Sequence, residues 1–177
     1  MPISDSIIYN QIMTPLKILT LIVTGPQNPA VLVLEPIEEH KDGVSRVVPI
    51  WIGINETMQL AVAIEHAKLP RPMTHDLFLD ALTNLDTCVD HVVITDVKGQ
   101  TFFAKLVLRQ GGRLIELDAR PTDAISLALR EDAPFMIEDD VLAASSFPYI
   151  FKDEKLKEAQ LEEFHSFIKD LNPEDFT

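Results

Sequence analysis

The order of the secondary-structure elements that the sequence predicts is its strongest constraint on the fold. Short apolar runs between clusters of Gly, Pro, Asn and Asp predict strands, and apolar residues that recur at helical spacing predict helices. Three strands followed by a helix occur twice. The strands are expected at 16–24, 30–38, 46–53, 89–97, 101–109 and 113–119, and the helices that end the two units at 55–68 and 121–131. We therefore expect an α+β fold in which two related β-β-β-α units form one domain.

The two units differ most where the third strand meets the helix. Sliding the second unit back by 65 residues aligns the units by pattern and element order, with little identity. This alignment places Gly53, Asn55 and Met58 of the first unit at the positions of Asp118, Arg120 and Asp123 in the second. A shared scaffold does not require these charges, so they predict an added site in the second unit.

A further helix, 75–85, is expected between the units, after the prolines of "LPRPM". Asn55 and Thr74 have side chains typical of N-caps for the helices that follow them. The apolar stripe of this middle helix is expected to comprise Leu77, Phe78, Ala81, Leu82 and Leu85.

The ends of the chain differ in character from its centre. We expect an N-terminal extension over 1–15, the domain over 16–145, and an acidic tail over 146–177 that contains an amphipathic helix.

Composition limits the classes of protein to consider. A chain of 177 residues can fold as one domain, and its formal net charge of -13 argues against sequence-independent binding of nucleic acid through many basic residues. Within 105–130, however, five basic residues outnumber three acidic ones. The single cysteine, Cys88, cannot form an internal disulfide, and no apolar run approaches the ~20 residues that span a bilayer. A cytoplasmic protein with no membrane segment is expected.

Three motifs in register carry a resemblance. The stretches "VPIWIG", "LPRPMTHDLF" and "IELDARPTDAISLALR" follow one another in the order found in the bifunctional nuclease (BFN) domain family, which the chain resembles over 16–145. The resemblance implies a compact α+β domain that self-associates as a homo-oligomer and a nuclease activity on DNA and RNA. It does not imply particular catalytic residues, so the following roles come from side-chain chemistry.

Carboxylates in the third motif are candidates for metal binding. Glu116 and Asp118 leave the same face of a strand, and Asp123 lies in the first turn of the next helix. Such oxygen ligands suit Mg²⁺ or Mn²⁺, and Arg120 between them is suited to hold a phosphate with its planar guanidinium. In the alternative interpretation Asp123 complements the helix dipole and Arg120 pairs with Asp118, so that the string is purely structural.

The second motif supplies candidates for proton transfer. His75 can act as a general base near neutral pH, and Asp76 beside it can raise its basicity. Thr-His-Asp is also an ordinary way to begin a helix. Arg71, Lys105 and Arg109 are further candidates for contact with substrate phosphates.

We expect one of two functions, the first of which is favoured by the family resemblance. The first is a nuclease that hydrolyses phosphodiester bonds in DNA, RNA or both, assisted by Mg²⁺ or Mn²⁺. The second is a non-catalytic oligomeric module that binds a ligand or a protein, in which the charged strand end forms an ion-pair network.

Overall fold

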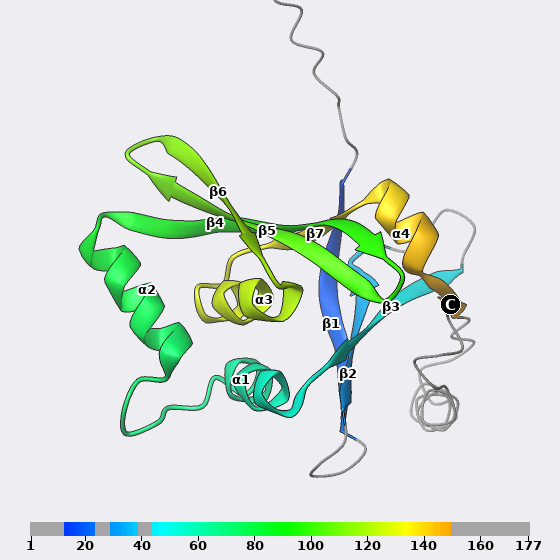
Figure 1. Ribbon diagram of the computed structural model, residues 1–177, viewed down its shortest axis with the longest axis horizontal. Coiled ribbons are helices and arrows are strands. Elements are labelled where there is room, and N and C mark those ends of the chain that lie inside the picture. Colours follow the sequence, from blue (N-terminus) through cyan, green and yellow to red (C-terminus); the bar gives the residue numbers. More distant parts are fainter. Residues whose placement is uncertain (1–12, 24–28, 39–43, 150–177) are drawn as a thin grey trace, which may run out of the picture.

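A computed structural model describes residues 13–23, 29–38 and 44–149 of the chain. Within these residues, eight strands form one mixed sheet that packs with four helices, as Figure 1 shows. The expected α+β fold class is confirmed. The amphipathic helix predicted in the tail and most of the predicted N-terminal extension lie outside the described residues.

The strands and helices alternate along the chain as follows. The strands are β1 (Met13–Val23), β2 (Ala30–Pro36), β3 (Ser45–Ile52), β4 (Thr87–Lys98), β5 (Thr101–Gln110), β6 (Arg113–Ala119), β7 (Phe135–Glu138) and β8 (Phe147–Tyr149). The helices are α1 (Ile54–Ile64), α2 (Thr74–Asn84), α3 (Pro121–Arg130) and α4 (Asp139–Ser145).

Each run of three consecutive strands forms an antiparallel meander in its own half of the sheet. The strand order is β6-β5-β4-β7-β1-β2-β3-β8. Strand β7 joins the halves because it pairs antiparallel with β1 and parallel with β4. Helix α1 follows the first meander and α3 follows the second, and the two helices contact each other. A common origin of the two halves stays a prediction, which superposition of one half on the other would test.

Burial on both faces explains the apolar run of β2 from Ala30 to Leu34. Ala30, Leu32 and Leu34 contribute to the main core, whereas Val31 and Val33 point to the opposite face and form a smaller apolar cluster. Successive side chains of a strand alternate between faces, so a strand covered on both sides is apolar at consecutive positions. Glu35, which follows this run, is buried and pairs with Lys17.

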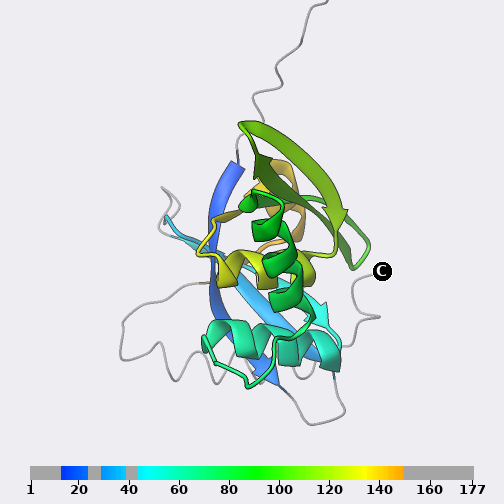
Figure 2. The ribbon, with the colours of Figure 1, turned by 90° about the vertical axis from the view of Figure 1, so that its left-hand side faces the viewer.

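The helices α1, α2 and α3 gather on one side of the molecule, in front of β1 and β2 in Figure 2. Helix α3 is almost entirely buried, and its small residues Ala124, Ser126 and Ala128 let its neighbours approach closely. It contacts α1, α2, β4 and β5. The position of α3 therefore determines which polar side chains of the other two helices can meet.

The helix starts differ by one or two residues from the predicted ones. The N-cap of α1 is Gly53 and that of α2 is Met73, rather than Asn55 and Thr74. At α2 the side chain of Asp76 reaches back to accept a hydrogen bond of 2.8 Å from the Met73 N–H. A carboxylate at the third helical position thus replaces the hydroxyl cap that was expected.

The predicted apolar stripe of α2 is only partly right. The buried residues are Leu79 and Leu82, whereas Leu77 and Leu85 are 62% and 63% exposed. Helix α2 contacts α3 and β4. The buried face of the helix is therefore narrower than the apolar stripe that the sequence predicted.

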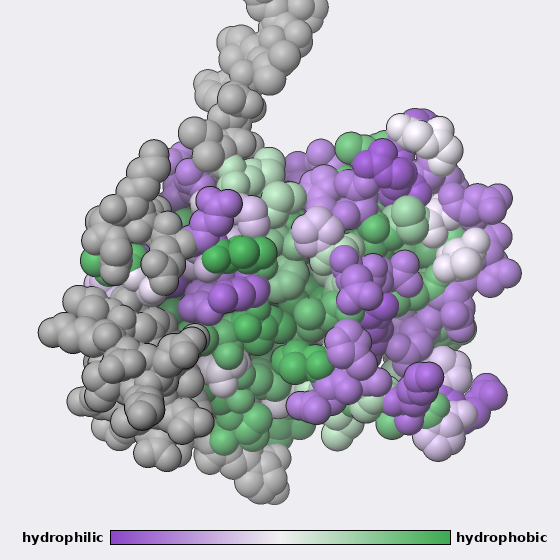
Figure 3. All heavy atoms as spheres, turned by 180° about the vertical axis from the view of Figure 1, so that it is seen from behind, coloured by the Kyte–Doolittle hydropathy of each residue, from purple (hydrophilic) through white to green (hydrophobic). Residues whose placement is uncertain are grey.

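Hydropathy varies across the surface. In the view from behind Figure 1, apolar side chains occupy the middle of the face and hydrophilic ones gather to one side (Figure 3). In the described parts of the chain, no helix has the length and apolarity needed to cross a membrane.

Candidate active site

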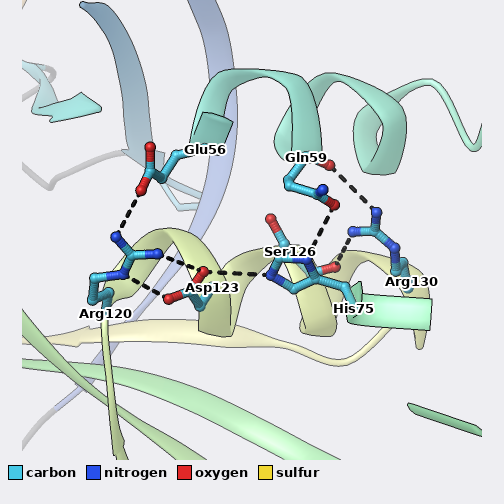
Figure 4. A network of polar contacts seen from close by, with 7 residues as sticks. All are labelled: Glu56, Gln59, His75, Arg120, Asp123, Ser126 and Arg130. Carbon is cyan, nitrogen blue, oxygen red and sulfur yellow. Dashed lines mark hydrogen bonds and ion pairs between the residues drawn. The ribbon is translucent and has the colours of Figure 1, made fainter. Parts of the chain in front are cut away.

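Arg120 lies at the junction between β6 and α3, where the sequence predicted an added site. It is the N-cap residue of α3, and Pro121 occupies the first helical position. Its guanidinium donates to both carboxylate oxygens of Asp123, from Nε to Oδ2 at 2.7 Å and from Nη2 to Oδ1 at 3.2 Å. The third nitrogen, Nη1, donates to Oε1 of Glu56 at 2.6 Å. Arg120 therefore connects the starts of α1 and α3 (Figure 4).

His75 joins this cluster from α2. Its Nε2 atom lies 3.5 Å from Oδ1 of Asp123, and its Nδ1 atom lies 3.1 Å from Oε1 of Gln59. Its side chain is only 13% exposed, whereas that of Arg120 is 65% exposed. Figure 4 shows the imidazole between α1 and α3. The network thus has a solvent-facing guanidinium and a sheltered ring, with Asp123 in contact with both.

The environment favours the neutral form of the His75 ring. Burial, reinforced by the positive charge of Arg130, lowers the pKa of His75, although Asp123 and Asp76 act in the opposite direction. When the neutral ring carries its proton on Nδ1, toward Gln59, Nε2 can accept a second proton, which the Asp123 carboxylate then stabilises. The pair formed by Nε2 and the Asp123 carboxylate can then accept one proton between its members.

Arg130, at the end of α3, holds the three helices together. Its Nε donates to Oδ1 of Asp76 at 2.8 Å, Nη1 to the Ser126 carbonyl at 2.9 Å, and Nη2 to the Gln59 carbonyl at 3.4 Å. Its side chain is 10% exposed. These contacts fix α2 against α1 and α3, and they place His75 where it meets Asp123.

Asp76, predicted as a catalytic candidate, is occupied on both oxygens. One oxygen accepts from Arg130 and the other from the Met73 N–H. Burial acts to raise the pKa of Asp76, but the hydrogen bonds from Met73 and Arg130 outweigh it and the pKa is lowered. The carboxylate is thus held as an anion that anchors the start of α2.

The three predicted metal ligands do not come together. Glu116 accepts a hydrogen bond of 2.5 Å from Lys105, and Asp123 contacts Arg120 and His75. Asp118 is exposed and makes no ion pair with any residue in the described ranges. In the whole of the described part of the chain, no group of three His, Cys, Asp or Glu side chains is arranged to hold a metal ion. In this arrangement the donor set therefore does not fit a metal centre.

The predicted phosphate-binding cations lie apart from the network. Lys105 pairs with Glu116, which raises the pKa of Lys105. Arg109 donates from Nε to Asp90 at 2.6 Å. Arg71 is exposed in the connection between α1 and α2. Lys105 and Arg109 pair with residues outside the network, and Arg120 is the predicted cation that the network contains.

Glu56, Gln59 and Arg130 were not among the predicted site residues. Glu56 and Gln59 are three positions apart and therefore share a face of α1, and Asp123 and Arg130, seven apart, share a face of α3. A search for polar pairs at helical spacing on otherwise apolar helices would have found both faces. Their meeting depends on the contact between α1 and α3, which the spacing does not reveal.

Comparison with known families identifies the family of the chain. Residues 37–149, which include all three helices of the network, match the bifunctional nuclease domain. The chain belongs to the bifunctional nuclease domain family. The resemblance in the three sequence motifs is thereby confirmed, and the network of Figure 4 is a feature of a bifunctional nuclease domain.

Three curated proteins are similar to this chain in sequence. An uncharacterized protein of Mycobacterium tuberculosis (strain H37Rv) is 34% identical over 171 residues, which cover 93% of this chain and 98% of the relative. Bifunctional nuclease 1 of Oryza sativa subsp. indica is 26% identical over 124 residues, or 68% of this chain and 36% of the plant protein. Bifunctional nuclease 2 of Arabidopsis thaliana is 26% identical over 100 residues, or 55% of this chain and 30% of that protein.

Proposed function

We propose that this protein hydrolyses phosphodiester bonds in DNA, RNA or both at the network around Arg120. The observation that carries the proposal is the contact of Asp123 with both an exposed guanidinium and a sheltered, neutral imidazole in a bifunctional nuclease domain. A cation that reaches solvent and a group that accepts a proton are the two components that hydrolysis of a phosphodiester needs from the protein.

Arg120 serves as the phosphate-binding residue in this proposal. Its planar guanidinium presents several donors in one plane, which suits the oxygens of a phosphate. Glu56 and Asp123 hold it at the mouth of the network. These two ion pairs position the arginine before the substrate binds. A substrate phosphate then replaces one of the carboxylates as its partner, so little further ordering of the side chain is needed.

The Asp123–His75 pair serves as the proton acceptor. A water molecule attacks phosphorus, its proton passes to the pair between Oδ1 and Nε2, and the bond from phosphorus to the leaving oxygen breaks. The leaving oxygen takes a proton from solvent. Asp76 and Arg130 act as positioning residues, because they hold the start of α2 and with it His75.

Dependence on Mg²⁺ or Mn²⁺ is a separate proposal. Since Glu116, Asp118 and Asp123 do not converge, no step of the proposed reaction is assigned to a metal ion. Purified protein incubated with labelled DNA and RNA, in EDTA and with each ion, tests cleavage and metal dependence together. Arg120→Lys should slow cleavage. Arg113 is an exposed residue of β6, and Arg113→Lys should leave the cleavage rate unchanged.

Absence of cleavage under every condition would contradict the nuclease proposal. It would favour the non-catalytic alternative, in which the network stabilises a binding module.

We also propose that the protein self-associates. Met58 of α1 and Leu77 of α2 are each 62% exposed, and apolar surface of this kind is suited to a second copy. Light scattering of the purified protein measures the number of subunits.

A further inference from the structure

Two adjoining cavities extend from Arg120 along the edge of β3. One, of about 250 Å³, is lined at its polar end by Glu56 and Arg120. The other, of about 170 Å³, reaches Phe147. Trp51, Gln100 and Phe102 line both cavities. Because the two cavities share these three lining residues, they adjoin, and we refer to them together as the aromatic groove, whose polar end is part of the candidate active site.

Strand pairing explains why the groove is open. Strand β8 pairs with β3 only at Ser45, Arg46 and Val47. Among the described residues, no strand pairs with the rest of this edge of β3, whose other edge pairs with β2. The turn between β4 and β5 lies opposite this edge, and Gly99 adopts the positive φ of 60° that the tight turn requires. The groove is the space between the β3 edge and this turn.

Aromatic side chains from different strands define the groove. Trp51 of β3 packs against the smaller apolar cluster rather than the main core, and it is half-buried. Phe102 of β5 is also half-buried, and Phe147 of β8 is 37% exposed. Gln100, from the turn, offers both a hydrogen-bond donor and an acceptor. Flat apolar surfaces beside an amide are suited to a planar ligand that has a polar edge.

We propose that the substrate is single-stranded nucleic acid, whose base stacks in the aromatic groove beside Trp51 and Phe102 while the adjoining phosphate contacts Arg120. The inference rests on the proposed function, since it names the substrate class of the same site. Stacking on aromatic rings tolerates any base and does not need many cations, which agrees with the net charge of -13. In a duplex each base is stacked and paired, so it cannot enter a groove within the protein surface.

The fluorescence of Trp51 can report whether a ligand occupies the groove. Trp51 is the single tryptophan of the chain. Titration with a short poly-dT oligonucleotide in EDTA should quench its fluorescence to saturation. The same oligonucleotide annealed to poly-dA should quench it at least tenfold more weakly at equal concentration. Equal quenching by the duplex would overturn the proposal.

Phe102 and Phe103 provide a matched pair of variants. They are neighbours in β5, but only Phe102 lines the groove, whereas the Phe103 ring lies under Lys98 at 5.1 Å from its Nζ. Because leucine offers no flat ring for a base to stack on, Phe102→Leu should weaken oligonucleotide binding by about tenfold. Phe103→Leu should leave binding unchanged. Equal effects of both variants would show that the groove is not the binding site.

Failure of this inference can be separated from failure of the proposed function. If the protein cleaves nucleic acid and Arg120→Lys slows it, but Trp51 does not respond and Phe102→Leu cleaves normally, the groove proposal is wrong and the nuclease proposal stands. If single strands quench Trp51 and Phe102→Leu weakens this binding, but no condition produces cleavage, the groove proposal stands and the nuclease proposal is wrong.

Discussion

Arg120 donates a hydrogen bond of 2.6 Å to Glu56, which lies 64 residues earlier in the chain. This contact joins the helix after the first meander to the helix after the second. Arg120 is the residue of the network that is most exposed to solvent, so it can be substituted with little effect on the core.

Substitution of Arg120 tests the proposed phosphate contact. Arg120→Lys retains the charge but loses the planar fork, so cleavage should fall by about 10²-fold. The free energy of unfolding should change by less than about 1 kcal/mol, because the ion pairs of an exposed side chain contribute little. Cleavage assays and urea unfolding of the same preparation measure both. A cleavage rate equal to that of Arg113→Lys and of the unchanged protein would count against the assignment.

Gly53 provides an indirect way to move Glu56. A Cβ at position 53 would lie 2.5 Å from Oε2 of Glu56, while the φ of -75° is allowed for alanine. Gly53→Ala should therefore displace the flexible end of Glu56 and loosen Arg120 without changing any charge. We expect cleavage to fall about as much as in Glu56→Gln.

The two changes should not add, because both act on the Glu56–Arg120 contact. A double variant whose loss equals the product of the single losses would show that Gly53→Ala acts elsewhere.

Asp118 and Asp123 form a matched pair within one motif. Asp123 contacts Arg120 and His75, whereas Asp118 is exposed and lies outside the network. Asp123→Asn should reduce cleavage by about 10²-fold or more, and Asp118→Asn should reduce it by less than about threefold. Steady-state cleavage rates in EDTA, Mg²⁺ and Mn²⁺ provide the comparison. A large loss in Asp118→Asn that appears only with a metal ion would instead support the metal ligands predicted from the sequence.

His75 should make stability depend on pH in a defined direction. Its pKa is lowered from the ordinary value of 6.5, chiefly by burial, so the unfolded chain binds a proton more readily than the folded one. The stability that this residue contributes is complete above about pH 6.5 and is lost as the pH falls through the lowered pKa. Urea unfolding at a series of pH values should show the loss, and His75→Gln should remove that part of the pH dependence. An unchanged pH profile in His75→Gln would contradict this account.

Arg130 should matter for stability as well as for activity. Arg130→Lys cannot reach the Asp76 carboxylate and the carbonyls of Ser126 and Gln59 together, so the free energy of unfolding should fall by about 1–2 kcal/mol. Arg130→Met also removes the positive charge that contributes to the lowered pKa of His75, so the histidine ring signals in NMR spectra should show a titration of His75 at higher pH in this variant. If the His75 titration stays the same while stability falls, Arg130 supports the fold but does not tune the ring.

Local patterns predicted the elements well because each strand and helix carries its own apolar period. The position of β7 between the meanders was not predictable in this way, since pairing between β7 and β1 depends on residues far apart in the chain. The charges at Arg120 and Asp123 were conspicuous at a strand end. The metal prediction grouped Asp123 with Glu116 and Asp118 by sequence proximity, but α3 directs Asp123 toward α1 and α2 instead.

Strand β7 also has a consequence for synthesis of the protein on the ribosome. The two meanders share a sheet only through this strand, which is made after both of them. Until residue 138 has left the exit tunnel, β1 and β4 lack the neighbour that joins them. A nascent chain that stalls before this point should present two exposed strand edges, which are prone to aggregation. Both edges stay unpaired in a nascent chain from which α3 has emerged but β7 has not.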